Sequence, residues 1–222
     1  MSTNLFRVVV ADMPWKYNDR GEKCKLNPDK ATKFGVGVQR RYSAGTMTTQ
    51  EILDLGAHLR PLLADDAYLI SWVTCPRLKE GIAALEAWGF RYINVPFFWS
   101  KVYSNGDSFS GPGRYVPSNL EFTILGVRGK PWHKSTGSKP RQEIRCPHPR
   151  DPSSGKIIHS RKPEEMQDRL DKWLGPFIGE FDKLEMFATR QRPGWKCLGH
   201  QLSSSRIDQD LDHLAQELKE KK

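Results

Sequence analysis

Long apolar runs and paired cysteines are both missing from this 222-residue chain. No apolar stretch approaches the roughly 18 residues that a membrane-spanning helix needs. The four cysteines (24, 75, 146 and 197) form no Cys-x-x-Cys pair, which favours reduced intracellular thiols over a disulfide scaffold. The chain opens without a basic segment ahead of an apolar one, so a secretory signal is not indicated. We therefore expect a cytoplasmic protein that does not enter a membrane.

Several sequence motifs that identify common enzyme classes are also missing. The chain has no Gly-x-x-x-x-Gly-Lys-Ser/Thr loop and no Gly-x-Gly-x-x-Gly after a strand, which excludes the usual phosphate-loop and dinucleotide-binding proteins. Cys146, His148 and His159 do not follow a usual zinc-ligand spacing, and no second ligand pair accompanies them. We therefore expect no metal site. A cysteine–histidine nucleophile has no supporting motif either.

Charge of one sign is in excess. The chain has 35 Lys and Arg against 26 Asp and Glu, a formal net charge of +9. Residues 101–162 alone hold 12 basic and 4 acidic residues, so this stretch carries most of the excess. Such a concentration is typical of a groove for nucleic acid. A solvated basic surface would have the same composition, and charge alone does not decide between them.

Apolar patterns with the periods of strands and helices alternate along the chain. Strands are predicted at 6–11, 67–74, 90–100 with a break at Pro96, 119–127 and 184–187, and helices at 48–63, 76–88, 163–174 and after 203. This alternation predicts an α/β, Rossmann-like fold with a mainly parallel sheet and helices on both faces. Ligands bind at the carboxyl ends of the strands in such sheets. Asp12 and Glu185 both fall at predicted strand ends.

The predicted domain covers residues 1–202 and carries two long basic loops rich in Gly and Pro, at 16–41 and 129–155. We expect both loops to bind phosphates. Residues 203–222 form a separate amphipathic helix with Ile207, Leu211, Leu214 and Leu218 along one side. This stripe can dock on its own domain or pair with a second subunit. Both possibilities stay open, and we favour a homodimer.

The tetrapeptide Asp12-Met13-Pro14-Trp15 directly follows the first predicted strand. Methylation of an aromatic amine is difficult because the nitrogen lone pair is delocalised into the ring. A carboxylate and a backbone carbonyl that accept both amine hydrogens, with an aromatic ring beside them, can hold such an amine against a methyl donor. Asp12, the Met13 carbonyl and the Trp15 ring supply these parts in order. An ordinary strand-to-loop turn explains the same four residues.

This tetrapeptide and the segments around it resemble the MT-A70 family of N6-adenine methyltransferases, whose signature is Asp-Pro-Pro-Trp at the end of a strand. The resemblance runs in order from about Val8 to Gln201, most of the chain. Matching blocks lie at 45–48, 66–74, 87–90, 98–101, 121, 126–129, 159–165, 184–187 and 193–195, the last followed by Gly199. So many blocks at fitting spacing indicate a specific match.

The resemblance implies S-adenosylmethionine as the cofactor and assigns roles to individual positions, with the catalytic segment preceding the cofactor segment. The catalytic segment would be Asp12, Met13, Pro14 and Trp15. The cofactor would be bound by Asp12, Lys162, Glu185, Arg190, His200 and Gln201, with Lys162 on its carboxylate. The target base would be contacted by Trp15, Tyr42, Trp99, Lys101 and Glu121. A core position for Trp99 and a surface position for Glu121 are the alternatives.

Two positions depart from the family pattern. Met13 replaces the first proline of the signature, which leaves a less rigid turn. Thr189 stands where the family usually has arginine, so Arg190 or Arg192 is expected to reach the ribose instead.

The activity implied is transfer of a methyl group from S-adenosylmethionine to the N6 amine of adenine in nucleic acid. We favour DNA at a specific site, because the chain is small and shows no RNA-binding module. A target base within a duplex must first be flipped out. The alternatives are an RNA N6-adenosine methyltransferase and a non-catalytic nucleic-acid-binding subunit. Asp12, Trp15 and Lys162 are all present, which argues against the second.

Overall fold

The computed structural model describes residues 5–16, 46–111, 115–131, 139–158, 161–174, 182–203 and 205–220. In chain order the strands are β1 (Phe6–Asp12), β2 (Leu63–Val73), β3 (Arg91–Asn94), β4 (Phe98–Val102), β5 (Leu120–Arg128), β6 (Glu143–Pro147), β7 (Lys183–Met186) and β8 (Lys196–Leu198). The α-helices are α3 (Thr49–Leu59), α4 (Leu78–Ala87), α5 (Glu164–Leu174) and α6 (Ile207–Glu220). Short 3-10 turns, η2 (Arg60–Leu62) and η3 (Cys75–Arg77), precede β2 and α4.

All of these strands belong to one sheet in the order β6-β4-β5-β2-β1-β7-β8, with β3 also paired to β5. Strand β1 is central and parallel to both β2 and β7, and β8 continues the parallel part beside β7. Strand β5 runs antiparallel to β2, β3 and β4, while β6 is parallel to β4. The ends of β1, β2 and β7 therefore meet at the same edge as the beginning of β5.

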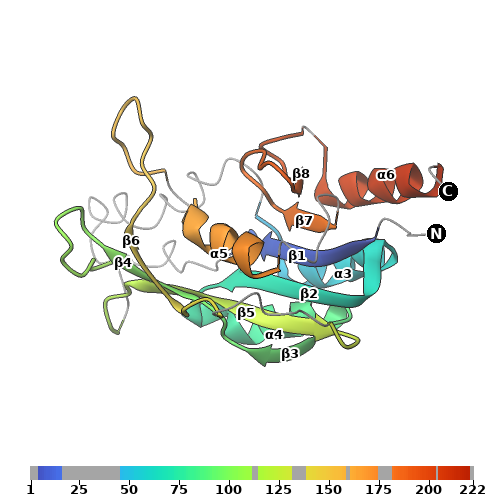
Figure 1. Ribbon diagram of the computed structural model, residues 1–222, viewed down its shortest axis with the longest axis horizontal. Coiled ribbons are helices and arrows are strands. Elements are labelled where there is room, and N and C mark those ends of the chain that lie inside the picture. Colours follow the sequence, from blue (N-terminus) through green and yellow to red (C-terminus); the bar gives the residue numbers. More distant parts are fainter. Residues whose placement is uncertain are drawn as a thin grey trace, which may run out of the picture.

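Helices cover both faces of the sheet (Figure 1). Along β1, Val9 and Ala11 point into one hydrophobic cluster, and Val8 and Val10 point into the other. The first cluster is covered by α3, α4 and α6, and the second by α5. A strand buried on both faces explains why residues 6–11 read as a continuous apolar run. The predicted Rossmann-like α/β fold is confirmed.

Local sequence signals act as expected around α3 and α4. The Thr48 hydroxyl accepts the Glu51 amide hydrogen at 3.2 Å, and the Glu51 carboxylate accepts the Thr48 amide hydrogen at 2.7 Å, which completes a capping box. Trp88 donates its indole hydrogen to the Ile52 carbonyl at 2.8 Å and so joins the two helices. Gly89, at φ 91°, then turns the chain toward β3.

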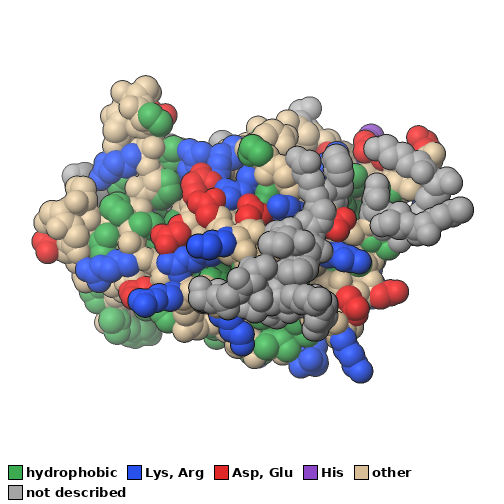
Figure 2. Space-filling model, in the orientation of Figure 1, with side chains coloured by type: hydrophobic (Ala, Val, Ile, Leu, Met, Phe, Trp, Pro, Cys, Tyr) green, Lys and Arg blue, Asp and Glu red, His purple; other side chains and the backbone are tan. Residues whose placement is uncertain are grey.

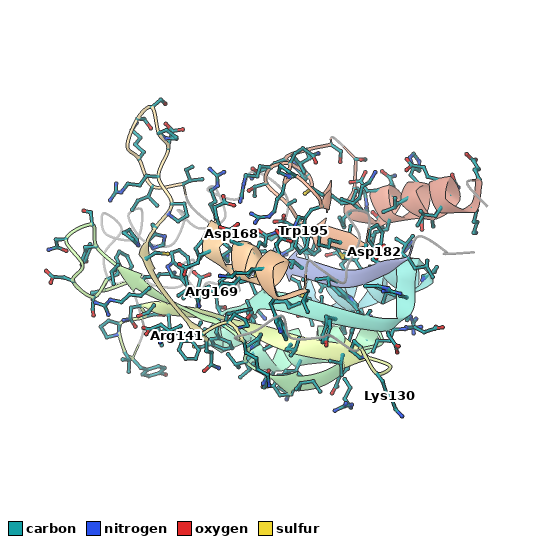
Figure 3. All side chains as sticks on the ribbon, viewed as in Figure 1. Lys130, Arg141, Asp168, Arg169, Asp182 and Trp195 are labelled. Atoms are coloured by element: carbon teal, nitrogen blue, oxygen red, sulfur yellow. The ribbon has the colours of Figure 1, made fainter. Side chains whose placement is uncertain are left out.

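Three predicted elements differ from the structure. The loop predicted over 129–155 contains strand β6, and a further strand, β8, follows the segment predicted to be the last strand. Pro76 lies in turn η3, and α4 begins only at Leu78. Strands β6 and β8 are short, so their sequences carry little periodicity, and pairing with β4 and β7 sets their conformation. Arg169 of α5 also donates to the backbone carbonyls of Arg141 and Glu143 at the start of β6 (Figure 3).

The apolar stripe of α6 packs against the domain from which it extends. Leu211 and Leu214 are buried, and Ile207 and Leu218 pack against the same cluster from its margin. Asp212 also contacts Nδ1 of His58 on α3 at 2.7 Å. Among the described residues, no helix is long and apolar enough to cross a membrane.

Candidate active site

A pocket lies at the carboxyl ends of β1 and β7. Asp12 is the last residue of β1 and is in register with Trp72 of β2, while Glu185 of β7 is in register with Val10. The empty space between its walls is about 380 Å³, including the solvent at its open mouth. Its lining residues are Val10, Asp12, Trp72, Arg161, Lys162, Gln167, Glu185, Phe187, Thr189 and Arg190. This is the edge at which a parallel sheet is expected to bind its ligand.

Four side chains of alternating charge, here called the charge chain, extend from the pocket toward β4. Nζ of Lys162 lies 2.9 Å from Oδ2 of Asp12 and 3.3 Å from Oε2 of Glu121. Nζ of Lys101 in turn lies 2.5 Å from Oε1 of Glu121. When all four groups are ionised, the two lysines and two carboxylates balance and the cluster carries no net charge. Asp12, with 34% of its side chain exposed, is its most accessible member.

Burial and the neighbouring charges set the proton affinities of this chain. Burial raises the pKa of Asp12 above its ordinary 3.8, although Lys162 opposes the change. Burial also works against ionised Glu121, but Lys162 and Lys101 overcome it and lower its pKa from 4.5 to about 2. Burial likewise opposes the charged form of Lys162, yet Asp12 and Glu121 outweigh it and raise the pKa of this lysine. Glu121 is therefore ionised at neutral pH and Lys162 is charged.

Glu185 is the second carboxylate of the pocket. Nε2 of Gln167, a buried side chain on α5, donates to Oε2 of Glu185 at 2.7 Å. Burial raises the pKa of Glu185, and the hydrogen bond from Gln167 opposes this. The amide therefore holds the carboxylate in one orientation at the pocket wall.

The segment after β7 bends sharply around the pocket. Phe187 has φ 62°, which is unfavourable for a residue with a side chain, and such conformations are concentrated at functional sites. Arg190 lines the pocket and also pairs with Glu164 at the start of α5. Arg192 contacts Glu164, at 2.9 Å, and Asp168 on the same helix. Of the two arginines considered for the ribose, Arg190 is therefore the one at the pocket.

A second set of contacts fixes the same segment to α5. Trp195 donates its indole hydrogen to Asp171 at 3.1 Å, and Lys183 of β7 contacts Asp171 at 2.8 Å. Trp195 lies beside α5, near Asp168, in Figure 3. Helix α5 thus links the two sides of the pocket, since Lys162 immediately precedes it and the segment from Phe187 to Trp195 is bonded to it.

The backbone after Asp12 is held in a tight turn. The Trp15 amide donates to the Met13 carbonyl at 2.9 Å, and the Met47 amide donates to the Pro14 carbonyl at 2.8 Å. The Met13 carbonyl keeps a second lone pair for another donor. The Trp15 ring is packed in the hydrophobic core, and its Nε1 has no hydrogen-bond partner among the described residues. The face expected to stack on a base is thus not open in this structure, and that role stays a prediction.

Trp99 is buried in the core, in agreement with the alternative considered for it. Its indole donates to the Cys146 carbonyl at 2.9 Å, and the His148 ring packs edge-on against it at 4.9 Å. Nζ of Lys101 lies 4.8 Å from the centre of the Trp99 ring. Cys146 and His148 thus hold the Trp99 ring in place, and this ring packs against Lys101, the member of the charge chain farthest from the pocket. His159, the third residue considered for a metal, lies outside the described residues.

The structure brings together most, but not all, of the expected site residues. Asp12, Lys162, Glu185 and Arg190 line one pocket, and Lys101 and Glu121 join it through the charge chain. His200 and Gln201 lie exposed in the turn after β8 and are not among the described residues that line the pocket. Tyr42 lies outside the described residues.

Six lining residues were not foreseen from the sequence: Val10, Trp72, Arg161, Gln167, Phe187 and Thr189. For one of them a signal was present. Gln167 lies three residues before Leu170, on the face of α5 that is otherwise apolar. A polar residue at an apolar phase of a helix indicates a buried hydrogen bond. The strain at Phe187 has no comparable signal in the sequence.

Comparison with known proteins settles the relationship. The MT-A70 family model matches residues 6–201. This chain belongs to the MT-A70 family. The resemblance inferred from the sequence blocks is therefore confirmed.

The chain is similar to several individual proteins, and the share of each protein's length that it covers differs. The chain is 28% identical to the type II methyltransferase M.MunI of Mycoplasma sp, over 91% of this chain and 80% of that protein. It is 25% identical to the N(6)-adenosine-methyltransferase MT-A70-like protein of Arabidopsis thaliana, over 91% of this chain and 24% of that protein. It is also 25% identical to the N(6)-adenosine-methyltransferase catalytic subunit METTL3 of Homo sapiens, over 89% of this chain and 28% of that protein. The chain thus spans about a quarter of the plant and human proteins.

Proposed function

We propose that this chain transfers a methyl group from S-adenosylmethionine to the N6 amine of adenine at specific sites in DNA. The observation that carries the proposal is the placement of Asp12. Its carboxylate ends a central parallel strand, remains partly exposed, and is held by Lys162 at the edge of a pocket. Asp12 also begins the tetrapeptide that corresponds to the MT-A70 signature.

DNA is favoured over RNA by the pattern of relatives. M.MunI, which is named as a type II methyltransferase, is covered over 80% of its length. The relatives named as adenosine methyltransferases are covered only in part. The excess of basic residues over 101–162 suits either polyanion and supports nucleic acid in general.

The pocket suits S-adenosylmethionine by the chemistry of its donors. Glu185, held by Gln167, is a partly buried carboxylate that can accept hydrogen bonds from sugar hydroxyls. Lys162 supplies a cation for a carboxylate, and Asp12 supplies an acceptor for an amino group. Arg190 offers further donors from the opposite wall. When bound there, the cofactor supplies an electrophilic methyl group next to the strand end.

The protein's own part in the reaction is to hold and orient the adenine amine. The Asp12 carboxylate accepts one N6 hydrogen, and the free lone pair of the Met13 carbonyl accepts the other. Two acceptors in fixed positions direct the nitrogen lone pair away from the ring plane and toward the pocket. The turn bonded to Met47 supplies this fixed geometry, although Met13 replaces a proline.

The remaining assignments form part of the same proposal. The basic segments at 16–41 and 129–155 bind DNA phosphates, the catalytic domain covers 1–202, and the protein acts in the cytoplasm. A homodimer is also proposed, but the apolar stripe of α6 is already used within the chain. Any interface between two copies must therefore use another surface, or α6 must undock.

Methyl transfer from labelled S-adenosylmethionine tests the function directly. The substrates are methyl-free duplex DNA of mixed sequence, made by amplification, and RNA transcribed from the same templates. We expect N6-methyldeoxyadenosine on nucleoside analysis, and sequencing of the product then gives the modified site. Label found only in RNA adenosine would support the RNA alternative. Cofactor binding without any transfer would support the non-catalytic one.

Asp12→Ala provides the matching test of the site. Turnover should fall by about 100-fold or more, because the amine loses its charged acceptor. Asp54→Ala, at an exposed carboxylate on α3, serves as the control and should keep wild-type turnover. Circular dichroism of both variants checks the fold. Undiminished turnover in a folded Asp12→Ala protein would remove Asp12 from the mechanism.

A further inference from the structure

Large hydrophobic side chains are exposed in one segment of the chain. Within the described residues, five such side chains are exposed, and four of them, Tyr103, Tyr115, Val116 and Leu120, lie between β4 and the start of β5. Tyr115 is 89% exposed and Val116 is 73% exposed. We call the described part of this connection, residues 103–111 and 115–119, the β4–β5 arm. Exposed apolar groups gathered on one loop mark a surface that contacts another molecule.

The β4–β5 arm extends directly from the candidate active site. It starts two residues after Lys101 and ends two residues before Glu121, and these two side chains are in contact at 2.5 Å. Glu121 contacts Lys162, which contacts Asp12. Strand β5 begins at the edge where β1 ends, so the arm extends from the same edge of the sheet as the pocket, and Figure 1 shows the connection between β4 and β5 at that end of the sheet.

The arm is a braced structure. The Gly111 amide donates to the Ser118 carbonyl at 3.0 Å, and the Phe109 amide donates to the Lys101 carbonyl at 3.0 Å. The Phe109 ring packs against His148 at 5.1 Å, next to β6. These contacts fix the stem of the arm, so its exposed side chains are presented without a large further loss of backbone entropy.

The surroundings of the arm favour a polyanion as its partner. Arg145 of β6 donates to the Gly106 carbonyl at 2.8 Å and so lies against the arm, with Arg150 and Lys156 exposed on the loop that follows. Figure 2 shows hydrophobic side chains interspersed with Lys and Arg at this end of the molecule. Apolar side chains flanked by cations fit a DNA duplex. The apolar side chains can contact the faces of the stacked bases, and the cations can contact the phosphates on either side.

We propose that the β4–β5 arm inserts Tyr115 and Val116 into duplex DNA and fills the space that the target adenine leaves when it enters the pocket. This inference rests on the proposed function. A flipped base leaves an unstacked gap, and apolar or aromatic side chains inserted there stabilise the opened duplex. The arm stands where such a wedge is needed, because it borders the charge chain that ends at Asp12.

The test compares the double variant Tyr115→Ala/Val116→Ala with wild type on the modified site found by the transfer experiment. One duplex pairs the target adenine normally, and a second places it opposite an abasic position, where opening costs little. The double variant should lose about tenfold or more turnover on the paired duplex and recover most of it on the second. Tyr115→Phe should behave as wild type. Ile93→Ala, at an exposed residue on β3, is the control.

A second readout reports base opening without catalysis. A duplex with 2-aminopurine at the target position should brighten when wild type binds, and brighten much less with the double variant. Equal losses of turnover on both duplexes, or no loss on either, would overturn the wedge while leaving the methyltransferase assignment standing. Wild type that forms no N6-methyldeoxyadenosine in any DNA would overturn the proposed function, and the wedge with it.

Discussion

Lys162 has carboxylates on two sides, with Asp12 at 2.9 Å and Glu121 at 3.3 Å. From the sequence this lysine was expected to bind the cofactor carboxylate, and its position in the pocket is compatible with that role. The structure adds a second consequence. Its charge opposes the effect of burial on Asp12 and so favours the ionised carboxylate that the proposed chemistry needs.

Lys162→Ala should therefore change both cofactor affinity and pH dependence. Loss of a charged hydrogen bond corresponds to about 1.5–3 kcal/mol, so calorimetry should show weaker binding of the cofactor. Asp12 already has a pKa raised above 3.8, and removal of the neighbouring cation raises it further. Because activity needs ionised Asp12, the acidic limb of kcat/KM should move to higher pH. Lys79→Ala, on an exposed part of α4, should show neither change.

The change in cofactor affinity and the change in pH dependence are tested separately. An unchanged cofactor dissociation constant would remove Lys162 from the cofactor site. An acidic limb that stays at the wild-type position would show that Asp12 does not sense Lys162 during turnover.

Glu121 makes a different contribution, because its ionised form stabilises the fold. The difference between an unfolded pKa of 4.5 and a folded value of about 2 corresponds to about 3 kcal/mol. Since the folded pKa is the lower one, this stabilisation is present above pH 4.5 and is lost as the pH falls from there toward 2. Glu121→Gln should lower the free energy of urea unfolding at pH 7 and differ less from wild type at pH 3.5. A difference independent of pH would contradict the ion-pair origin.

At the level of helices and strands, the sequence predicted the elements whose conformation is set by neighbouring residues. It did not predict the strands whose conformation is set by pairing with distant parts of the chain. The capping box of Thr48 and Glu51, the apolar run of β1 and the stripe of α6 are local patterns, and each gave the correct element. Strands β6 and β8 depend on pairing with distant strands and were missed. The same distinction holds in the site. Asp12 and Lys162 belong to motifs, whereas Gln167 lies outside the matching blocks and reaches the pocket only through tertiary packing.

The contact between α3 and α4 offers a test of one such packing requirement. A Cβ added at Gly56 would lie 2.6 Å from the Ala87 carbonyl oxygen, which belongs to the backbone of α4. Gly56→Ala gains helix propensity but forces the two helices apart, and overpacking of this kind costs about 1–3 kcal/mol. We expect a lower free energy of unfolding in urea. Ala57→Ser, at the exposed neighbouring position, should change it little, and a Gly56→Ala protein more stable than wild type would refute the close approach.

Across the whole molecule, both sides of the pocket depend on α5. Lys162 lies two residues before the start of this helix, on one side of the pocket. On the other side, Glu164, Asp168 and Asp171 of the helix bind the segment from Arg190 to Trp195. Gln167 orients Glu185 from the same helix. The catalytic strand end and the proposed cofactor wall are thus positioned by one element. This arrangement explains how residues more than 150 positions apart in the sequence form a single site.

Helix α6 takes no part in forming the pocket. Variants of this helix can show whether its apolar stripe packs on its own domain or between two copies of the chain. Its stripe is buried against α3 and the core, with Leu211 fully buried, while His213 and Glu217 are exposed. A chain cut after Ser203 should therefore lose stability and keep its affinity for the cofactor. Leu211→Ala should lower the free energy of unfolding by about 2–5 kcal/mol without changing the mass measured by sedimentation. A wild-type dimer that Leu211→Ala converts to monomer at unchanged stability would instead place the stripe between two copies, with α6 undocked from its own domain.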